Sequence, residues 1–256
     1  MKKIGFLGCG RIAEPMVVSL VRRFPDARIF VSTRSEDISH SLESRFNNVQ
    51  AGENQWVVDQ ADTVVLSVLA QVARKVLPVL RFRPGQEVIS VMADIALAEV
   101  QSLTAPADPP CVTIPLPFID GGGCPLPVFP RSPVLEELFG DENTVITVEK
   151  ETHMGPHFAA TALLSTLMAQ MDTATDWLGT KTGDRKQAEV YVATLVGGYL
   201  GSLPKDGQER FREALYDLST EGGLNTQLLT HNRSHGMTEF LYEGFVQLGR
   251  RLEQTS

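Results

Sequence analysis

A glycine turn close to the start of the chain constrains its fold more than any other feature. Ile4, Phe6 and Leu7 form an apolar run that is too short for a helix and suits a buried strand. The segment Gly8-Cys9-Gly10 ends this run, and an apolar helical pattern follows from residue 12 to residue 24. A strand, a glycine turn and a helix in this order are the context in which a G-x-G-x-x-G/A motif predicts dinucleotide binding.

Each small residue of this motif has its own expected role. Gly8 makes the tight turn, Gly10 lets a pyrophosphate approach the backbone, and Ala13 lets the helix pack closely on the strand. The backbone N–H groups at Arg11 and Ile12 are expected to hold the phosphates, helped by the helix dipole. The alternative is a βα turn with a purely structural role.

The loop after the second predicted strand, residues 27–31, bears on the choice of dinucleotide. It holds two hydroxyl groups, an arginine and another serine: Ser32, Thr33, Arg34 and Ser35. An acid at this point would bind the ribose 2′-hydroxyl of NAD, and the nearest acids come only at Glu36 and Asp37. Arg34 is able to form a bidentate contact with a phosphate and stack on adenine, so the loop predicts NADP. The alternative is a solvated polar loop.

Strands and helices alternate through about residue 149, which predicts an α/β fold with a parallel, doubly wound sheet. Further strands are expected at residues 63–69, 87–93, 111–114 and 143–148, and helices at residues 54–60, 71–80 and 96–103. After residue 149 the pattern is helical only, with helices expected at residues 158–178, 187–200, 208–218 and 237–252. The sequence therefore predicts a Rossmann domain over residues 1–150 and an all-helical dimerisation and substrate domain over residues 151–256.

The helix expected at residues 158–178 is apolar nearly all round. Such a helix must be buried in a core or in a subunit interface. Because about a hundred residues of helix offer little separate core, we expect a homodimer or a higher homo-oligomer.

Composition and charge exclude several classes of partner. The net charge of −8 argues against a nucleic acid or an anionic membrane surface. No segment reaches the roughly eighteen apolar residues of a membrane span, and the Met-Lys-Lys start leaves no room for a signal peptide. The 3 cysteines argue against a disulfide framework or a zinc site. We expect a soluble, cytoplasmic protein that acts on a small molecule.

Taken together, these features resemble the pyrroline-5-carboxylate reductase family over essentially the full length. Residues 2–13 are similar to the family's opening strand and glycine turn, and Thr33-Arg34-Ser35 is similar to its 2′-phosphate loop. Val68-Leu69-Ala70-Gln71 stands where the family has Val-Lys-Pro-Gln, residues 90–95 (SVMADI) where it has Ser-x-x-Ala-Gly-Ile, and residues 219–225 (STEGGLN) where it has Thr-Ser-Pro-Gly-Gly-x-Thr. The resemblance implies a Rossmann domain, a dimerising helical domain, cofactor contacts at Val68 and Leu69, and reduction of a cyclic imine to proline with NAD(P)H.

The chain departs from the family where the imine would bind. Residues 112–116 (VTIPL) replace Arg-Val-Met-Pro-Asn, and residues 157–163 (HFAATAL) replace Ser-Gly-Ser-Gly-Pro-Ala-Tyr. The family threonine that hydrogen-bonds the imine falls at Asn225, and the glycine of Ala-Gly-Ile falls at Asp94. Because Ala and Phe do not readily adopt the positive-φ backbone that captures a carboxylate, these changes predict a divergent substrate.

Three residues are the candidates for chemistry, and each has a plainer alternative. Asn225 is able to donate a hydrogen bond to a substrate nitrogen or oxygen, or simply to cap a helix. His157 is a candidate general acid, although a histidine at a helix start often has no catalytic role. Asp94 follows a strand end and is placed to bind a cationic amine or to act as an N-cap. His231 and His235 have no third ligand, so no metal is expected.

We therefore expect an NADP-dependent reductase that delivers a hydride to a small imine. Two other functions stay open: a non-catalytic NADP-binding sensor or scaffold, and a carbonyl reductase of the hydroxyacid-dehydrogenase type. A carbonyl reductase of this type uses a lysine on the helix after the Rossmann domain as its proton donor. Here Lys150 precedes that helix and Lys181 follows it, so this function is less well supported.

Overall fold

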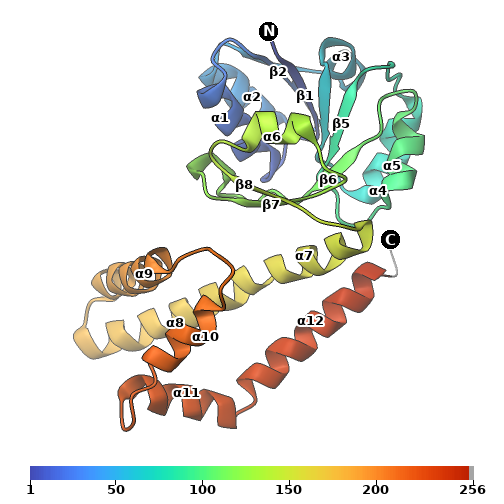
Figure 1. Cartoon of the computed structure of the whole chain (residues 1–256). Helices are drawn as coiled ribbons and strands as arrows, with labels where there is room; N and C mark the ends of the chain where they lie inside the picture. Colours follow the sequence, from blue (N-terminus) through green and yellow to red (C-terminus); the bar gives the residue numbers. More distant parts are fainter. Residues whose placement is uncertain (254–256) are drawn as a thin grey trace. The chain divides into compact units, whose positions relative to one another are not determined.

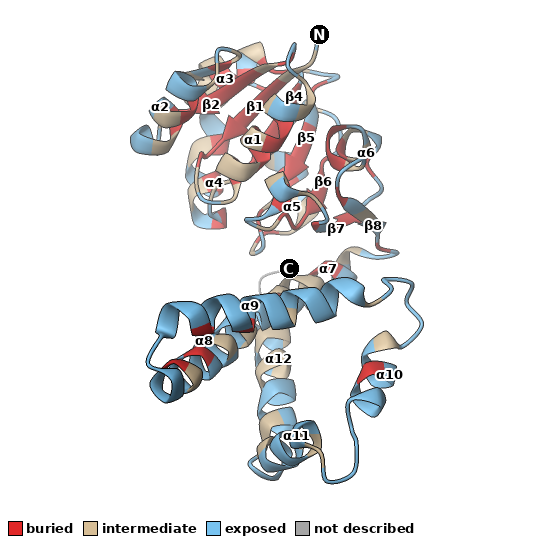
Figure 2. Ribbon diagram, turned by 90° about the vertical axis from the view of Figure 1, so that its left-hand side faces the viewer, coloured by how far each residue is buried: buried red, intermediate tan, exposed pale blue. Residues whose placement is uncertain are grey.

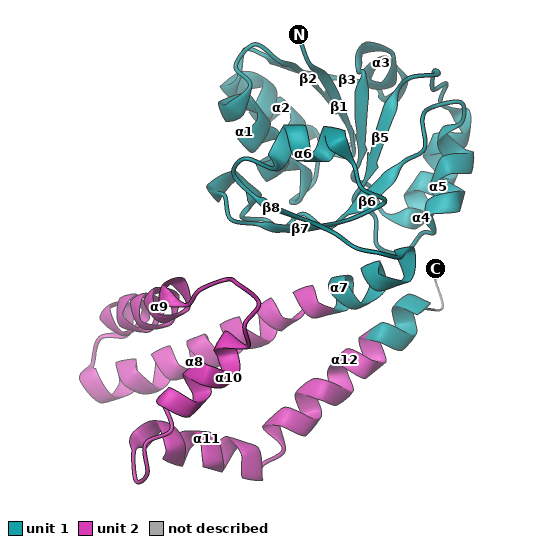
Figure 3. Ribbon diagram, in the orientation of Figure 1, with its two compact units in different colours: residues 1–159, 249–256 teal, residues 160–248 magenta. Residues whose placement is uncertain are grey.

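The computed structural model describes residues 1–253, which form two compact units (Figure 3). Unit 1 contains residues 1–159 together with the C-terminal residues from 249, and unit 2 contains residues 160–248. The chain therefore leaves unit 1 once and returns to it once.

Unit 1 is built on one twisted sheet (Figure 1). Its strand order is β3-β2-β1-β4-β5-β6-β7-β8, and every pairing is parallel except that of β6 with β7. The order reverses between β1 and β4, which is the topological switch point where open α/β sheets bind their ligands. The strands are β1 (Lys3–Leu7), β2 (Arg28–Ser32), β3 (Val49–Gly52), β4 (Thr63–Leu66), β5 (Glu87–Ser90), β6 (Cys111–Thr113), β7 (Pro125–Phe129) and β8 (Thr144–Thr147).

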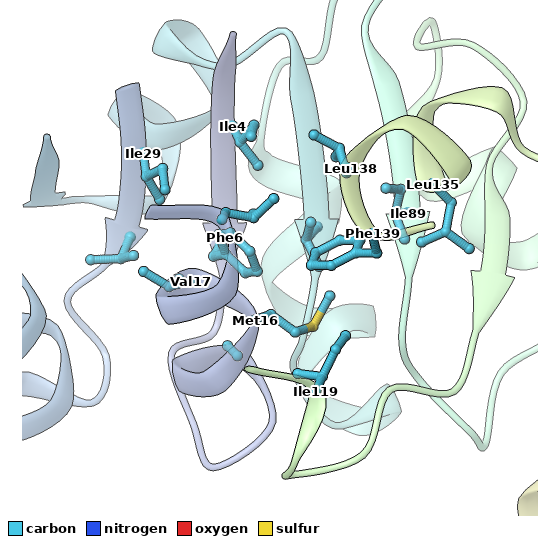
Figure 4. Packing of buried hydrophobic residues seen from close by; sticks show 14 of the residues in the cluster. Ile4, Phe6, Met16, Val17, Ile29, Ile89, Ile119, Leu135, Leu138 and Phe139 are labelled. Atoms are coloured by element: carbon cyan, nitrogen blue, oxygen red, sulfur yellow. The ribbon is translucent and has the colours of Figure 1, made fainter. Parts of the chain in front are cut away.

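Helices cover both faces of this sheet, because its strands alternate apolar side chains between two cores. Phe6 and Val65 belong to one core, whereas Val64 and Leu66 belong to the other. Figure 4 shows Phe6 in the first core, beside residues of α1 and α6. The α-helices of unit 1 are α1 (Ala13–Arg23), α2 (Glu36–Arg45), α3 (Asn54–Gln60), α4 (Ala70–Val76), α5 (Leu97–Thr104) and α6 (Pro133–Phe139), and the 3₁₀ turns are η1 (Leu77–Val79), η2 (Ile119–Gly121) and η3 (Glu151–His153).

The rest of the chain is helical, as the sequence predicts. Helix α7 (Met154–Thr161) leads from unit 1 into unit 2, and α12 (Met237–Glu253) leads back. Between them lie α8 (Leu163–Thr182), α9 (Arg185–Ser202), α10 (Arg210–Asp217) and α11 (Leu224–Ser234). Helices α8 and α9 form a hairpin, because Gly183 ends α8 at φ 77° and the Asp184 carboxylate accepts from the Gln187 N–H at 3.0 Å to start α9.

One local prediction for the helical part is wrong. The helix expected at residues 158–178 is two helices, α7 and α8, which meet at Ala162. Residues 232–234 form the last turn of α11. The backbone turns away one step later, where Gly236 adopts φ 81°.

Unit 2 has very little interior of its own, which Figure 2 shows as helices coloured mostly as exposed. Within residues 160–248, the buried residues are Thr175, Gly179, Ala188, Val192 and Ala214. Large apolar side chains are exposed instead, including Trp177 at 64%, Tyr191 at 59% and Leu228 at 63%. These helices are therefore not buried in a core of a single chain, and their burial in a subunit interface stays a prediction.

Among the described helices, none is long and apolar enough to cross a membrane.

We expect the protein to sediment at about twice the mass of one chain at micromolar concentration, because exposed apolar area of this extent is stabilised by burial against a second copy. Trp177→Asp combined with Tyr191→Asp should shift it to the monomer. Val79→Asp is the matched control, since Val79 is 76% exposed in unit 1 and should have no effect on association. A wild-type monomer at these concentrations would contradict the interface.

Candidate functional site

The glycine turn draws together the carboxyl ends of three neighbouring strands. The Gly8 N–H donates to the Ser32 Oγ at 2.8 Å, which ties the end of β1 to the end of β2. Gly8 has φ 91°, and a Cβ at this position would lie 2.3 Å from the Ser67 carbonyl oxygen after β4. Only glycine fits here, because both the backbone angle and the space exclude a side chain.

Gly10 stands in different surroundings. No atom lies within 4 Å of the place where a Cβ would be, so its outer face is open. Helix α1 starts just beyond, and its N-cap residue Ile12 provides no side-chain acceptor for the first N–H groups. Apart from the Glu14 N–H, which donates to the Gly10 carbonyl at 3.0 Å, these donors and the helix dipole can interact with an anion that approaches across Gly10. Arg11 is exposed beside them.

The four residues after β2 fall into two groups. Ser32 is buried at 1% exposure and holds the Gly8 N–H, so its hydroxyl supports the turn from behind. The Thr33 N–H donates to the Gly52 carbonyl at 3.1 Å, which fixes the start of the loop. Arg34 is exposed, and Ser35 is the N-cap residue of α2. The loop therefore presents one guanidinium from a fixed backbone.

Val68 and Leu69 lie after β4, on the other side of the turn. A Cβ on Gly8 would be 2.7 Å from the Val68 Cγ1, so Val68 packs directly on the turn. Leu69 is the N-cap residue of α4 and is 66% exposed. An apolar side chain so exposed at a switch point offers a surface to a flat ring.

The three candidates for chemistry are not brought together in one unit. Asp94 follows β5 in unit 1, where its Oδ2 lies 3.7 Å from the Arg251 Nη2. His157 lies on α7, also in unit 1, with its Nδ1 2.7 Å from the His153 carbonyl oxygen. Asn225 is exposed in the first turn of α11, in unit 2. Among residues 1–253, no hydrogen bond or ion pair links any two of them.

The residues around the turn fit a dinucleotide. The open face of Gly10 leaves room for a pyrophosphate, the α1 N–H groups can donate to it, and Arg34 adds a cation at the β2 side. The thiol of Cys9, within the turn, is not a reactive thiolate, since burial and the nearby Glu14 raise its pKa to about 12. The described residues contain no cluster of three or more side chains suited to a metal.

Two residues near Asp94 were missed by sequence reasoning. Arg251 pairs with Asp94, and the Glu151 carboxylate accepts from the Leu97 N–H at 2.8 Å. Both partners come from segments far along the chain, and the Glu151 contact spans 54 residues. No motif or periodicity signals such a pair.

Comparison with known proteins supports the nucleotide-binding assignment. Residues 3–94 match the family described as NADP oxidoreductase, coenzyme F420-dependent. The chain is 30% identical over 105 residues to pyrroline-5-carboxylate reductase 1 of Bacillus spizizenii and to its counterpart in Bacillus subtilis. Each of these matches takes in 39% of this chain and only 35% of the relative's length.

Solved structures extend the likeness in fold to nearly the whole chain. Pyrroline-5-carboxylate reductase from Streptococcus pyogenes has a TM-score of 0.81 at 16% identity and is covered over 98% of both chains. The Plasmodium falciparum enzyme with NADP bound has a TM-score of 0.84 at 12% identity, over 99% of this chain and 98% of that one. A reductive aminase from Aspergillus terreus in complex with NADPH has a TM-score of 0.60 at 12% identity, over 99% of this chain and 93% of that one.

The two glycines of the turn should respond differently to substitution. Gly10→Val should leave the melting temperature nearly unchanged, because the side chain enters open space, yet weaken NADPH binding by about a hundredfold or more by occupying the phosphate approach. Gly8→Ala should lower the melting temperature as well, because its Cβ overlaps the Ser67 carbonyl. Thermal melts and NADPH fluorescence titration measure both, and undiminished NADPH affinity in Gly10→Val would refute the role of the turn.

Proposed function

We propose that this chain, which is pyrroline-5-carboxylate reductase-like, is an NADP-dependent oxidoreductase that reduces the C=N bond of a small imine. The observation that carries the proposal is the glycine turn at the switch point, with Gly8 locked against Ser67 and Gly10 open above the start of α1. The similarity of residues 3–94 to an NADP oxidoreductase family supports the same assignment.

The choice of NADP rests on the loop after β2. Arg34 is exposed there, with no hydrogen bond or ion pair to its side chain among the described residues. A guanidinium free of protein partners is able to fork onto a 2′-phosphate. No carboxylate stands between Ser32 and Ser35 to claim the 2′-hydroxyl, and Glu36 and Asp37 begin helix α2 instead.

The chemistry proposed for the site needs little acid assistance from the protein. The bound nicotinamide would supply the hydride, and an iminium carbon accepts it readily because the group is already cationic. The Asp94 carboxylate is suited to orient such a cation. His157 keeps one ring nitrogen on the His153 carbonyl, which leaves Nε2 to exchange a proton, and Asn225 is a hydrogen-bond donor for the substrate nitrogen.

The proposal assigns the two parts of the chain different tasks. Residues 1–150 would bind the dinucleotide, and residues 151–256 would form the dimer. The exposed apolar side chains of unit 2 support a homodimer or higher homo-oligomer. Cys9, Cys111 and Cys124 are buried free thiols, which is compatible with a reducing cytoplasm.

The substrate of this reductase is proposed to differ from pyrroline-5-carboxylate. The helix that opens the helical part contains Phe158, Ala159 and Ala160 in regular α-helix, where a glycine-rich loop would be needed to bind a carboxylate through backbone N–H groups. A small imine without that carboxylate, or with it bound elsewhere, suits this segment better.

One observation favours a second candidate function, a non-catalytic NADP-binding sensor or scaffold. Among the described residues, no hydrogen bond or ion pair joins Asp94 to His157, and Asp94 already has a cationic partner in Arg251. A protein that kept the dinucleotide site without its chemistry would look the same around Gly8 and Gly10.

Oxidation of NADPH, followed by its absorbance with a panel of cyclic imines and 2-oxo acids, tests the function. We expect turnover with at least one imine and weaker or no turnover with pyrroline-5-carboxylate. Turnover of 2-oxo acids alone would favour the carbonyl reductase. Tight NADPH binding with no turnover across the panel would favour the sensor.

Arg34→Ala should raise the dissociation constant of NADPH by about ten- to a hundredfold and leave that of NADH within a factor of two, because only NADPH carries the 2′-phosphate. Arg81→Ala is a suitable control, since Arg81 is also an exposed arginine of unit 1 but lies outside the turn. Equal loss of affinity for both cofactors in Arg34→Ala would contradict the 2′-phosphate contact.

A further inference from the structure

Helix α5 begins without a cap from its own sequence. Its N-cap residue is Ala96, which has no side-chain acceptor, and alanine is among the poorest residues at this position. The first N–H of the helix, at Leu97, donates instead to the Glu151 Oε1 at 2.8 Å. A carboxylate at a helix N-terminus also interacts favourably with the helix dipole. Glu151 therefore supplies the missing cap from η3, the turn that precedes α7.

The loop that this cap holds is the β5–α5 loop, residues 91–96, which carries Asp94. The loop also makes a 3.7 Å ion pair between the Asp94 Oδ2 and the Arg251 Nη2, both of which are on exposed side chains. Arg251 lies in the last turn of α12, in the segment where the chain has returned to unit 1. Both segments that join the units thus contact one loop at the carboxyl edge of the sheet.

Apolar packing reinforces this arrangement inside unit 1. Leu97 packs against a small buried cluster that includes Ile114, Val148 and Met154. A Cβ on Gly155 would lie 3.7 Å from the Cβ of Leu252, so the start of α7 and the end of α12 are neighbours. Figure 3 shows these two helix ends side by side within unit 1. The loop is therefore supported by a packed base as well as by two polar contacts.

On the other side of α5, the first turn is held by a different pair. Arg74 of α4 donates to both carboxylate oxygens of Glu99, at 2.7 and 2.9 Å. Glu99 is thus engaged by Arg74 through both of its oxygens. Among the described residues, the carboxylate that accepts from the Leu97 N–H is therefore that of Glu151, and not that of Glu99 in the helix itself.

We propose that Glu151 is a positioning residue of the active site, which fixes the β5–α5 loop and thereby the placement of the Asp94 carboxylate. The proposal rests on the proposed function in one respect, that Asp94 meets a cationic substrate. We also infer that residues near the two connections between the units set the placement of the Asp94 carboxylate, because Glu151 precedes α7 and Arg251 lies at the end of α12. Glu151 itself touches neither substrate nor cofactor in this scheme.

The test compares Glu151→Ala with Glu151→Gln and with Glu149→Ala. Glutamine keeps an oxygen that can accept from the Leu97 N–H, whereas alanine does not. Glu149 is an exposed carboxylate two residues away with no partner among the described residues, so it controls for the loss of charge. The rate of amide hydrogen exchange in the peptide covering residues 97–100 reports whether the helix cap is intact. Steady-state kinetics with an imine that the enzyme reduces report whether loss of the cap changes KM or kcat.

In Glu151→Ala we expect exchange over residues 97–100 to be about five times faster, in line with the loss of a helix cap. KM for the imine should rise several-fold, with a smaller change in kcat and an unchanged dissociation constant for NADPH. Glu151→Gln should recover most of both effects, and Glu149→Ala should match the wild type.

Unchanged exchange over residues 97–100 in Glu151→Ala would overturn the proposal. Faster exchange with unchanged KM and kcat would also overturn it, because the cap would then be structural only. If the wild-type protein reduces no imine, the proposed function fails separately, and the exchange result still decides whether Glu151 holds the loop.

Discussion

The close approach of backbone at Gly8 is the constraint on which the site depends. The Ser67 carbonyl occupies the space that a Cβ would need, and the Ser32 hydroxyl takes the Gly8 N–H. These contacts bring the ends of β1, β2 and β4 to one point and leave Gly10 open beyond them. The strand order reverses between β1 and β4 at this same point, so the candidate site follows directly from the topology of the sheet.

The two units are stabilised in different ways. Unit 1 buries apolar side chains on both faces of its sheet, and its cores are closed within the chain. Unit 2 leaves side chains such as Trp177 and Tyr191 in solvent and holds its helix hairpin with polar contacts such as that of Arg185 with Asp176 at 2.7 Å. Exposed ion pairs of this kind contribute little to stability. A second copy of the chain is the covering that our proposal assigns to these helices.

The β5–α5 loop at the carboxyl edge of the sheet is contacted by residues that lie far along the chain. The β5–α5 loop follows a core strand, yet its polar anchors, Glu151 and Arg251, come from the segments that lead to and from unit 2.

Local order along the chain determined much of this protein. The turn at Gly8, the alternation of strands and helices to residue 149 and the helical remainder follow from periodicity and glycine chemistry, which act between neighbours in sequence. Tertiary structure alone decided that β7 runs antiparallel to β6, that Ser32 faces the turn, that α8 is exposed within one chain, and that Asp94 and Leu97 have distant partners. These features join residues that lie far apart in the chain. Neither residue of such a pair stands in a periodic pattern that would indicate its partner, because the two are brought together only by the folded chain.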